Sequence, residues 1–107
     1  MEATDRLTLI MNMLKKDPED SFLNYALAME YLAKDETENA IRQLEELVDR
    51  DANYLGTYYQ LGKLYEQKEE ADKAILIYKR GIEVAKQQDN NKAHGELNEA
   101  LWLLEDE

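Results

Sequence analysis

Apolar residues along the 107-residue chain recur at three- and four-residue steps, and short polar stretches interrupt them. Such spacing places apolar side chains on one face of an α-helix, whereas a half-buried strand would alternate them every second residue. The interruptions fall at residues 34–37, 67–70 and 87–91. One Pro and four Gly leave few other breaks. The pattern therefore predicts an all-α protein whose helices are joined by short turns.

The same pattern occurs twice in the chain, in two adjacent segments of equal length. Residues 21–54 align with residues 55–88 without a gap, and the identities fall at helical spacings. The identical pairs are Tyr25/Tyr59, Leu27/Leu61, Tyr31/Tyr65, Lys34/Lys68, Glu36/Glu70, Ala40/Ala74 and Ile41/Ile75. Each copy therefore predicts two amphipathic helices in succession.

The repeated residues resemble the signature of the tetratricopeptide repeat family, which reads aromatic-x-x-Leu-Gly-x-x-Tyr and then Ala-x-x-x-Phe. The second copy has Tyr58, Leu61, Gly62, Tyr65, Ala74 and Tyr78 at these positions, and the first copy is looser, with Asn24, Leu27, Ala28, Tyr31, Ala40 and Leu44. The resemblance implies an array of helical hairpins that forms a right-handed α-solenoid of about five helices. It also implies a function in binding other proteins.

The two flanks are expected to complete a single domain over residues 1–107. Two repeats cannot normally bury their own end faces, so each flank is expected to supply a capping helix. The expected segments are a partial repeat at 3–16, repeat one at 21–54, repeat two at 55–88 and a capping helix at 91–105. Pro18 resembles the family's turn residue and is expected in the first turn of the helix that follows. Ser21 is expected to cap a helix end.

Charge narrows the classes of partner. Asp and Glu number 24 against 13 Lys and Arg, which gives a net charge of -11. Such a surface repels phosphate groups, so nucleic acid and anionic membranes are not expected as partners. A basic or apolar protein partner is compatible with it, and so is a surface that only keeps the chain in solution. The acidic N-terminus lacks a signal-peptide pattern, and a cytoplasmic location is expected.

The chain offers little material for catalysis or metal binding. His94 is its one histidine, and there is no Cys, so a transition-metal site is not expected. No Asp-rich calcium loop and no Gly-rich phosphate loop occurs in the sequence. The sequence therefore predicts a protein that is not an enzyme and has no cofactor.

The resemblance implies that the first helix of each repeat lines a concave groove that receives peptides. Helical geometry then assigns residues to this groove. The candidate groove residues are Phe22, Tyr25, Met29, Leu32, Tyr59, Lys63 and Glu66. Aromatic and Met side chains are typical of adaptable binding surfaces. The alternative is that the N-terminal helix packs over Phe22, Tyr25 and Met29, which would then belong to the core.

Two functions remain open at this point. The first is an interaction module or adaptor that binds a peptide or helix of a partner protein in the groove. The second is a structural role in which the chain forms a homodimer through its end helices. Trp102 lies off the apolar face of the last helix, where it either forms an exposed contact surface or packs against the inner side.

Overall fold

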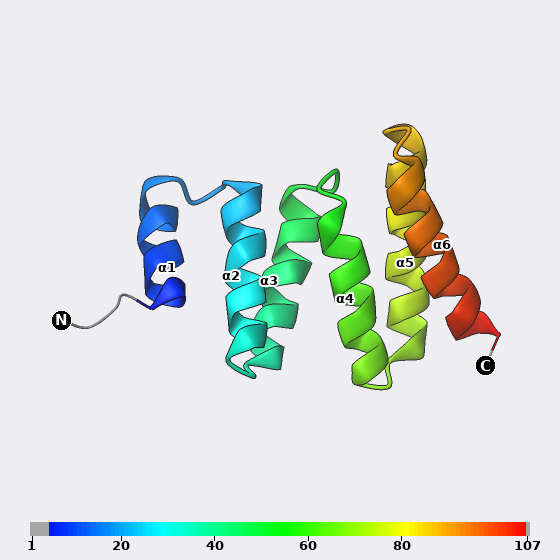
Figure 1. Ribbon diagram of the computed structural model, residues 1–107, viewed down its shortest axis with the longest axis horizontal. Helices are drawn as coiled ribbons and strands as arrows, with labels where there is room; N and C mark the ends of the chain where they lie inside the picture. The colour runs from blue at the N-terminus through cyan, green and yellow to red at the C-terminus, as the bar shows by residue number, and fades with distance from the viewer. Residues whose placement is uncertain (1–4, 107) are drawn as a thin grey trace. The chain divides into compact units, whose positions relative to one another are not determined.

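The computed structural model describes residues 5–106, and every regular element in this range is an α-helix. The helices are α1 (Arg6–Lys16), α2 (Ser21–Ala33), α3 (Thr37–Arg50), α4 (Gly56–Gln67), α5 (Ala71–Gln87) and α6 (Asn91–Glu105) (Figure 1). The all-α prediction is confirmed. The expected count of about five is one too low for this range, although the expected segments, two hairpins with a capping helix on each flank, match the six helices. Residues 3 and 4 of the expected N-terminal helix lie outside the described residues.

The chain divides into two compact units, Met1–Asp51 with α1 to α3 and Ala52–Glu107 with α4 to α6. In the first unit α2 packs against both α1 and α3. In the second unit α5 packs against both α4 and α6. Successive helices of each unit run antiparallel (Figure 1), as short connections require. The middle helix of each unit is therefore covered on two sides.

In the first unit, α3 supplies most of the buried apolar side chains. Its buried residues are Ala40, Ile41, Leu44, Leu47 and Val48. These positions recur at three- and four-residue steps, so they form one stripe along the helix. From α2, Leu27 and Ala28 are buried as well. Small residues on both helices, Ala28 and Ala40, have no exposed surface, as expected where two helix backbones approach closely.

Ion pairs link the N-terminal end of α1 to the C-terminal part of α2, and Ile10 is the one buried residue of α1. At the N-terminal end of α1, the Arg6 Nε lies 3.1 Å from a Glu30 carboxylate oxygen. The Lys34 Nζ lies 2.9 Å from a carboxylate oxygen of Asp5. The hydrogen bond from Lys34 lowers the pKa of Asp5, and Asp5 raises the pKa of Lys34. Both residues of this second pair are exposed, so solvent screening keeps its contribution to stability small.

In the second unit, two glycines allow large side chains to fill the space between helices. A Cβ atom at Gly62 of α4 would lie 2.2 Å from a ring carbon of Tyr78 on α5. A Cβ atom at Gly81 of α5 would lie 2.6 Å from the Cβ of Tyr58 on α4 and 3.0 Å from Leu97 on α6. Tyr58, Tyr78 and Leu97 are almost completely buried. The glycines are thus part of the core packing.

The turns after α2, α4 and α5 share one conformation. Each contains a non-glycine residue with positive φ, namely Asp35 (61°), Glu69 (61°) and Asp89 (54°). In the first turn, the Glu36 N–H donates to the Tyr31 carbonyl at 2.8 Å, and the Asp35 N–H donates to the Leu32 carbonyl at 3.0 Å. This pair of bonds defines a Schellman motif. The same pair follows at the other two turns.

Both hairpins begin with a side chain that bonds to the backbone of the preceding turn. The buried Asn24 amide donates to the Pro18 carbonyl at 3.0 Å, and its oxygen accepts from Gln43. At the equivalent position of the second copy, the Tyr58 hydroxyl donates to the Ala52 carbonyl at 2.6 Å. Asn24 thus keeps the hydrogen bond of the aromatic residue that the family signature places there.

Two local expectations about the start of α2 are wrong. Pro18 lies in the turn before the helix, which begins at Ser21. The cap is Asp20, whose side chain accepts from the Leu23 N–H, because a carboxylate one residue earlier is already in the capping geometry. Ser21 instead donates its hydroxyl proton to Asp51, the residue that ends α3.

Candidate protein-binding surfaces

Four of the candidate groove residues share one face of α2, named here the α2 face: Phe22, Tyr25, Met29 and Leu32. At about 100° per residue they fall within a quarter of the helix circumference. Phe22 is 65% exposed, and the other three side chains are half-buried. An exposed aromatic ring beside adaptable apolar side chains is a surface suited to an apolar ligand group.

The flank of α2 that contacts α1 is a different one. The ion pairs with α1 involve Glu30 and Lys34, which point roughly 100° away from Met29 and Phe22 around the helix. The exposure of Phe22 shows that α1 does not cover this ring. The other apolar side of α2 is where Leu27 and Ala28 are buried.

The remaining three candidate residues, Tyr59, Lys63 and Glu66, lie on α4. Together with Tyr78 of α5 they form a group named here the α4 cluster. The Lys63 Nζ lies 5.4 Å from the centre of the Tyr59 ring and 3.9 Å from a Glu66 carboxylate oxygen. The Tyr59 and Tyr78 ring centres are 6.5 Å apart, and the rings are tilted by 48°. The distance from Lys63 to the Tyr59 ring is typical of a cation–π contact, and the separation of the Tyr59 and Tyr78 rings is typical of an aromatic pair.

The hydroxyl of Tyr78 donates a hydrogen bond to the Glu66 carboxylate. Burial, and then this bond to an anion, raise the pKa of Tyr78 well above its ordinary value. The phenol therefore stays protonated, and one carboxylate oxygen of Glu66 remains engaged. The signature predicts only a packing role for Tyr78, because its position there gives no sign of this hydrogen bond.

Chemically, the α4 cluster presents an aromatic ring and an ammonium group side by side. Glu66 is committed to Tyr78, and its contact with Lys63 is long. The Lys63 ammonium is therefore available to a carboxylate or carbonyl oxygen of a ligand, because its contact with Glu66 is long. An apolar group of the ligand would contact Tyr59. The α2 face and the α4 cluster belong to different compact units. Their union into one groove remains a prediction.

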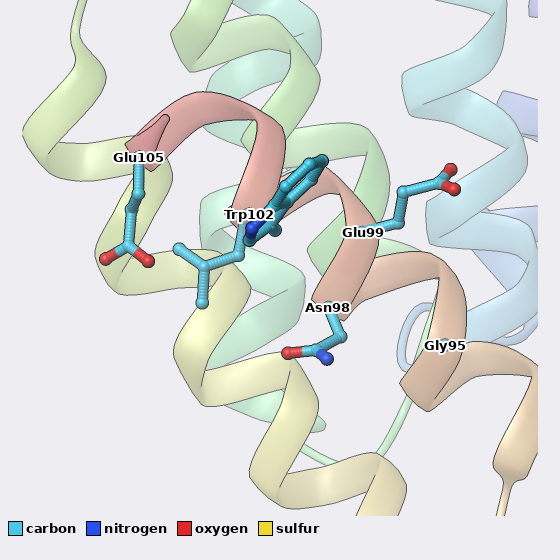
Figure 2. A pocket seen from close by; sticks show the side chains of 6 residues that line it. Gly95, Asn98, Glu99, Trp102 and Glu105 are labelled. Atoms are coloured by element: carbon cyan, nitrogen blue, oxygen red, sulfur yellow. The ribbon is translucent and has the colours of Figure 1, made fainter. Parts of the chain in front are cut away.

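A shallow open pocket of about 400 Å³ lies along one side of α6. It is lined by Gly95, Asn98, Glu99, Leu101, Trp102 and Glu105. Figure 2 shows Trp102 and Asn98 in the middle of this row, with Glu99 and Glu105 on either side. Trp102 is 63% exposed, so its side chain forms a contact surface. Of these residues, only Trp102 was predicted from the sequence to form a contact surface, although the seven-residue step from Gly95 already places both on one face.

Within residues 5–106 the structure indicates neither a metal site nor a membrane-spanning helix. No group of three or more His, Asp or Glu side chains in this range could hold a metal ion. None of the helices described here combines the length and the apolar character needed to cross a membrane.

The chain matches a known protein family and resembles proteins of solved structure. A family model described as "Tetratricopeptide repeat" matches residues 23–54 and 55–88. No curated protein matches the chain at a significant level. A tetratricopeptide repeat domain protein from Salinibacter ruber, solved by NMR, is 48% identical over 82% of this chain and 89% of its own, with a TM-score of 0.79. A crystal structure with the same description and organism is 46% identical over 80% and 97% of the two chains, with a TM-score of 0.78.

A more distant solved structure shares the fold alone. The TPR2B domain of yeast Sti1, solved as a complex with pHsp70, is 15% identical over 94% of this chain and 80% of its own, with a TM-score of 0.83. The family match covers more than half of the chain, and the Salinibacter relatives are nearly half identical to it over most of its length. The chain belongs to the tetratricopeptide repeat family, a fold that generally serves protein–protein interaction.

Proposed function

We propose that this chain is a protein-interaction module that binds a peptide or a helix of a partner protein through the α2 face and the α4 cluster. One observation carries the proposal: Phe22 exposes 65% of its surface on a face shared with Tyr25, Met29 and Leu32. An exposed aromatic residue beside half-buried apolar ones is the composition from which the energetically dominant contacts of interfaces are built.

The chemistry of the two surfaces defines the ligand that they fit. Apolar side chains of the ligand would contact Phe22 and Met29, and the Tyr59 ring would contact a further apolar group. Lys63 would orient the ligand by donating a hydrogen bond to a carboxylate or backbone carbonyl oxygen. A net charge of -11 favours ligands with basic residues outside these contacts. The pHsp70 complex of the Sti1 relative supports a ligand of protein origin.

The test uses variants that leave the core intact. Phe22→Ala and Lys63→Ala are expected to reduce the capture of partner proteins from lysate at least tenfold, because each removes a proposed ligand contact, while Lys63 loses only surface contacts with Tyr59 and Glu66. Leu76→Ala is the matched control, since Leu76 on α5 is exposed to the same degree, 64%, and lies outside both surfaces. A photo-crosslinker at position 22 should label the same partners. Unchanged capture by both variants would contradict the proposal.

We also propose a non-enzymatic, cofactor-free role without nucleic-acid or membrane partners. The acidic net charge supports this, because phosphate-rich surfaces would be repelled. A cytoplasmic location remains a prediction.

Self-association is the second candidate function. Its support is the exposure of three large apolar side chains on the short helix α1: Leu9, Met11 and Met13. A second copy of the chain that covered them would form a homodimer through end helices. The molar mass in solution separates this candidate from an interaction module that is monomeric on its own.

A further inference from the structure

The exposed side of α1 carries a row of four residues, named here the α1 stripe: Arg6, Leu9, Met13 and Lys16. The steps along the chain are three, four and three residues, so the row follows one face of the helix. Leu9 is 49% exposed and Met13 is 47% exposed. Among the six helices of the described range, α1 alone contains no acidic residue. In a chain of net charge -11, the α1 stripe is thus an apolar centre with basic ends.

The exposed side of α6 carries a row with the same steps, named here the α6 stripe: Gly95, Asn98, Trp102 and Glu105. It lines the open pocket shown in Figure 2, together with Glu99 and Leu101. Space beside Gly95 is open, because a Cβ atom there would meet nothing within 4 Å. The α6 stripe is thus an aromatic centre with acidic neighbours.

We propose that the α1 stripe of one copy of this chain docks antiparallel on the α6 stripe of a second copy. The inference rests on the self-association of the second candidate function, but it replaces the closed homodimer by an open row of copies, and it is independent of the proposed ligand groove. Antiparallel alignment of the two rows places Arg6 opposite Glu105, Leu9 opposite Trp102, Met13 opposite Asn98 and Lys16 opposite Gly95. All four positions align because the three-four-three spacing reads the same in both directions.

The side chains that face each other in this alignment have complementary charge or shape. The Leu9 side chain would cover the exposed Trp102 ring. The Arg6 guanidinium would face the Glu105 carboxylate, which the structure pairs only at 3.9 Å with Lys79. The aliphatic part of Lys16 would lie over Gly95, from which its ammonium group reaches Glu99 one turn further along α6. Arg6 already contacts Glu30, so that residue would share its guanidinium between two carboxylates.

Charge decides between this geometry and a dimer in which like stripes face each other. Two α1 stripes facing each other would bring basic residues together, and two α6 stripes would bring carboxylates together, which is unfavourable in both cases. A contact between unlike stripes uses the α1 stripe of one copy and the α6 stripe of the other, so the pair as a whole still has one free stripe of each kind. Association therefore continues beyond two copies, and added salt weakens it by screening the charges.

The chain contains one tryptophan, so the fluorescence of Trp102 reports directly on this contact. At low salt, raising the protein concentration is expected to shift the Trp102 emission to shorter wavelength, as the ring leaves water. Sedimentation equilibrium should show masses beyond that of a dimer over the same concentrations. Addition of about 0.5 M salt, which shortens the screening length to about 4 Å, should reverse both changes.

Two stripe variants provide the decisive mixing experiment. Leu9→Glu disables the α1 stripe and keeps Trp102, while Trp102→Glu disables the α6 stripe and removes the tryptophan signal. Each variant alone is expected to stay monomeric. Mixed together, they can form one intact contact, so the emission of the Leu9→Glu chain should shift to shorter wavelength, and the mass should stop at that of a dimer. Leu76→Glu is the control and should associate like the unmodified chain. Circular dichroism checks that all three variants stay helical.

Charge exchange gives a second pair of variants that leaves Leu9 and Trp102 unchanged. Arg6→Glu and Glu105→Arg should each weaken association at least several-fold, and a mixture of the two should recover it.

Each alternative result overturns the inference in a recognisable way. A mass that stops at a dimer in the unmodified chain, with no recovery on mixing, would keep the second candidate function and reject the antiparallel unlike pairing. If the chain stays monomeric at millimolar concentration and low salt, both the second candidate function and the pairing of unlike stripes are rejected. Trp102 emission already at short wavelength in dilute solution, independent of concentration, would show that something other than a second copy covers the α6 stripe.

Discussion

At the scale of single residues, the two hairpins fill equivalent core positions with different pairs of side chains. In the first, Ala28 on α2 and Leu44 on α3 are both fully buried. At the equivalent positions in the second, Gly62 faces Tyr78, whose ring occupies the place of a Cβ atom. A smaller residue on one helix thus accompanies a larger one on the other, because core volume is conserved at close packing.

Gly62→Ala is expected to lower the free energy of unfolding by about 1–3 kcal/mol, since the added methyl group would overlap the buried Tyr78 ring. The same substitution at Gly95 should raise the free energy of unfolding by about 0.5–1 kcal/mol, because the space there is open and Gly disfavours helices. Urea denaturation of both variants measures the two effects.

The control for this overlap is the pair found in the first hairpin. Gly62→Ala combined with Tyr78→Leu should lose less stability than the sum of the single changes, even though Tyr78→Leu also removes the hydrogen bond to Glu66. Strictly additive losses would show that the Tyr78 ring is not what opposes a methyl group at position 62.

At the scale of elements, the turns repeat as faithfully as the helices. Asp35 and Glu69 occupy equivalent positions of the two copies and adopt the same left-handed conformation, φ 61°. Glycine adopts this conformation without the steric penalty of a Cβ atom, and it is the usual residue at this position of a Schellman motif. These turns therefore retain strain that a substitution can remove.

Glu69→Gly is expected to raise the free energy of unfolding by about 1 kcal/mol, because glycine removes the left-handed penalty while the turn's backbone bonds remain. Thermal denaturation followed by circular dichroism checks this. Arg80→Gly, at an exposed position inside α5, is the control and should lower stability by about 1 kcal/mol. A loss of stability at both positions would refute a strained turn.

Periodicity predicted the helical hairpins and the polar breaks at 34–37, 67–70 and 87–91, because burial imposes the helical step on the sequence. It did not predict the left-handed residues, since none of the three is a glycine. Pro18 was misleading because its fixed φ suits a turn as well as a first helical residue.

Surface properties depend on contacts that periodicity does not reveal. Helical geometry grouped Phe22 with Met29 on one face, and their role in binding remains a prediction. The sequence did not reveal which flank of α2 contacts α1, because the ion pairs to Glu30 and Lys34 join segments with no regular spacing. The pocket beside Trp102 was likewise identified only in part.

At the scale of the whole molecule, the core is unevenly distributed over the helices. Within the described range, α4 and α5 each bury six residues, and α1 buries Ile10 alone. Surface ion pairs of the kind that hold α1 contribute little to stability. Local opening of α1 should therefore require much less free energy than opening of α5.

Amide hydrogen exchange is expected to show this difference residue by residue. The α1 amides should exchange fastest among the helices, and their exchange should accelerate with salt as the pairs from Arg6 and Lys34 are screened. The amides of α5 should exchange slowest and respond little to salt. Equal protection of α1 and α5 in dilute protein would mean that α1 is held by more than these contacts.

The bonds from Asn24 to the Pro18 carbonyl and from Tyr58 to the Ala52 carbonyl occur at the same place in two successive hairpins. Each hairpin supplies the donor of its opening bond, and the acceptor is a backbone carbonyl of the turn just before it, which any residue there can provide. Duplication or loss of one whole repeat would therefore leave each opening donor with a backbone acceptor. The length of such a chain is free to change during evolution by whole hairpins, without any of the surviving joints having to be rebuilt.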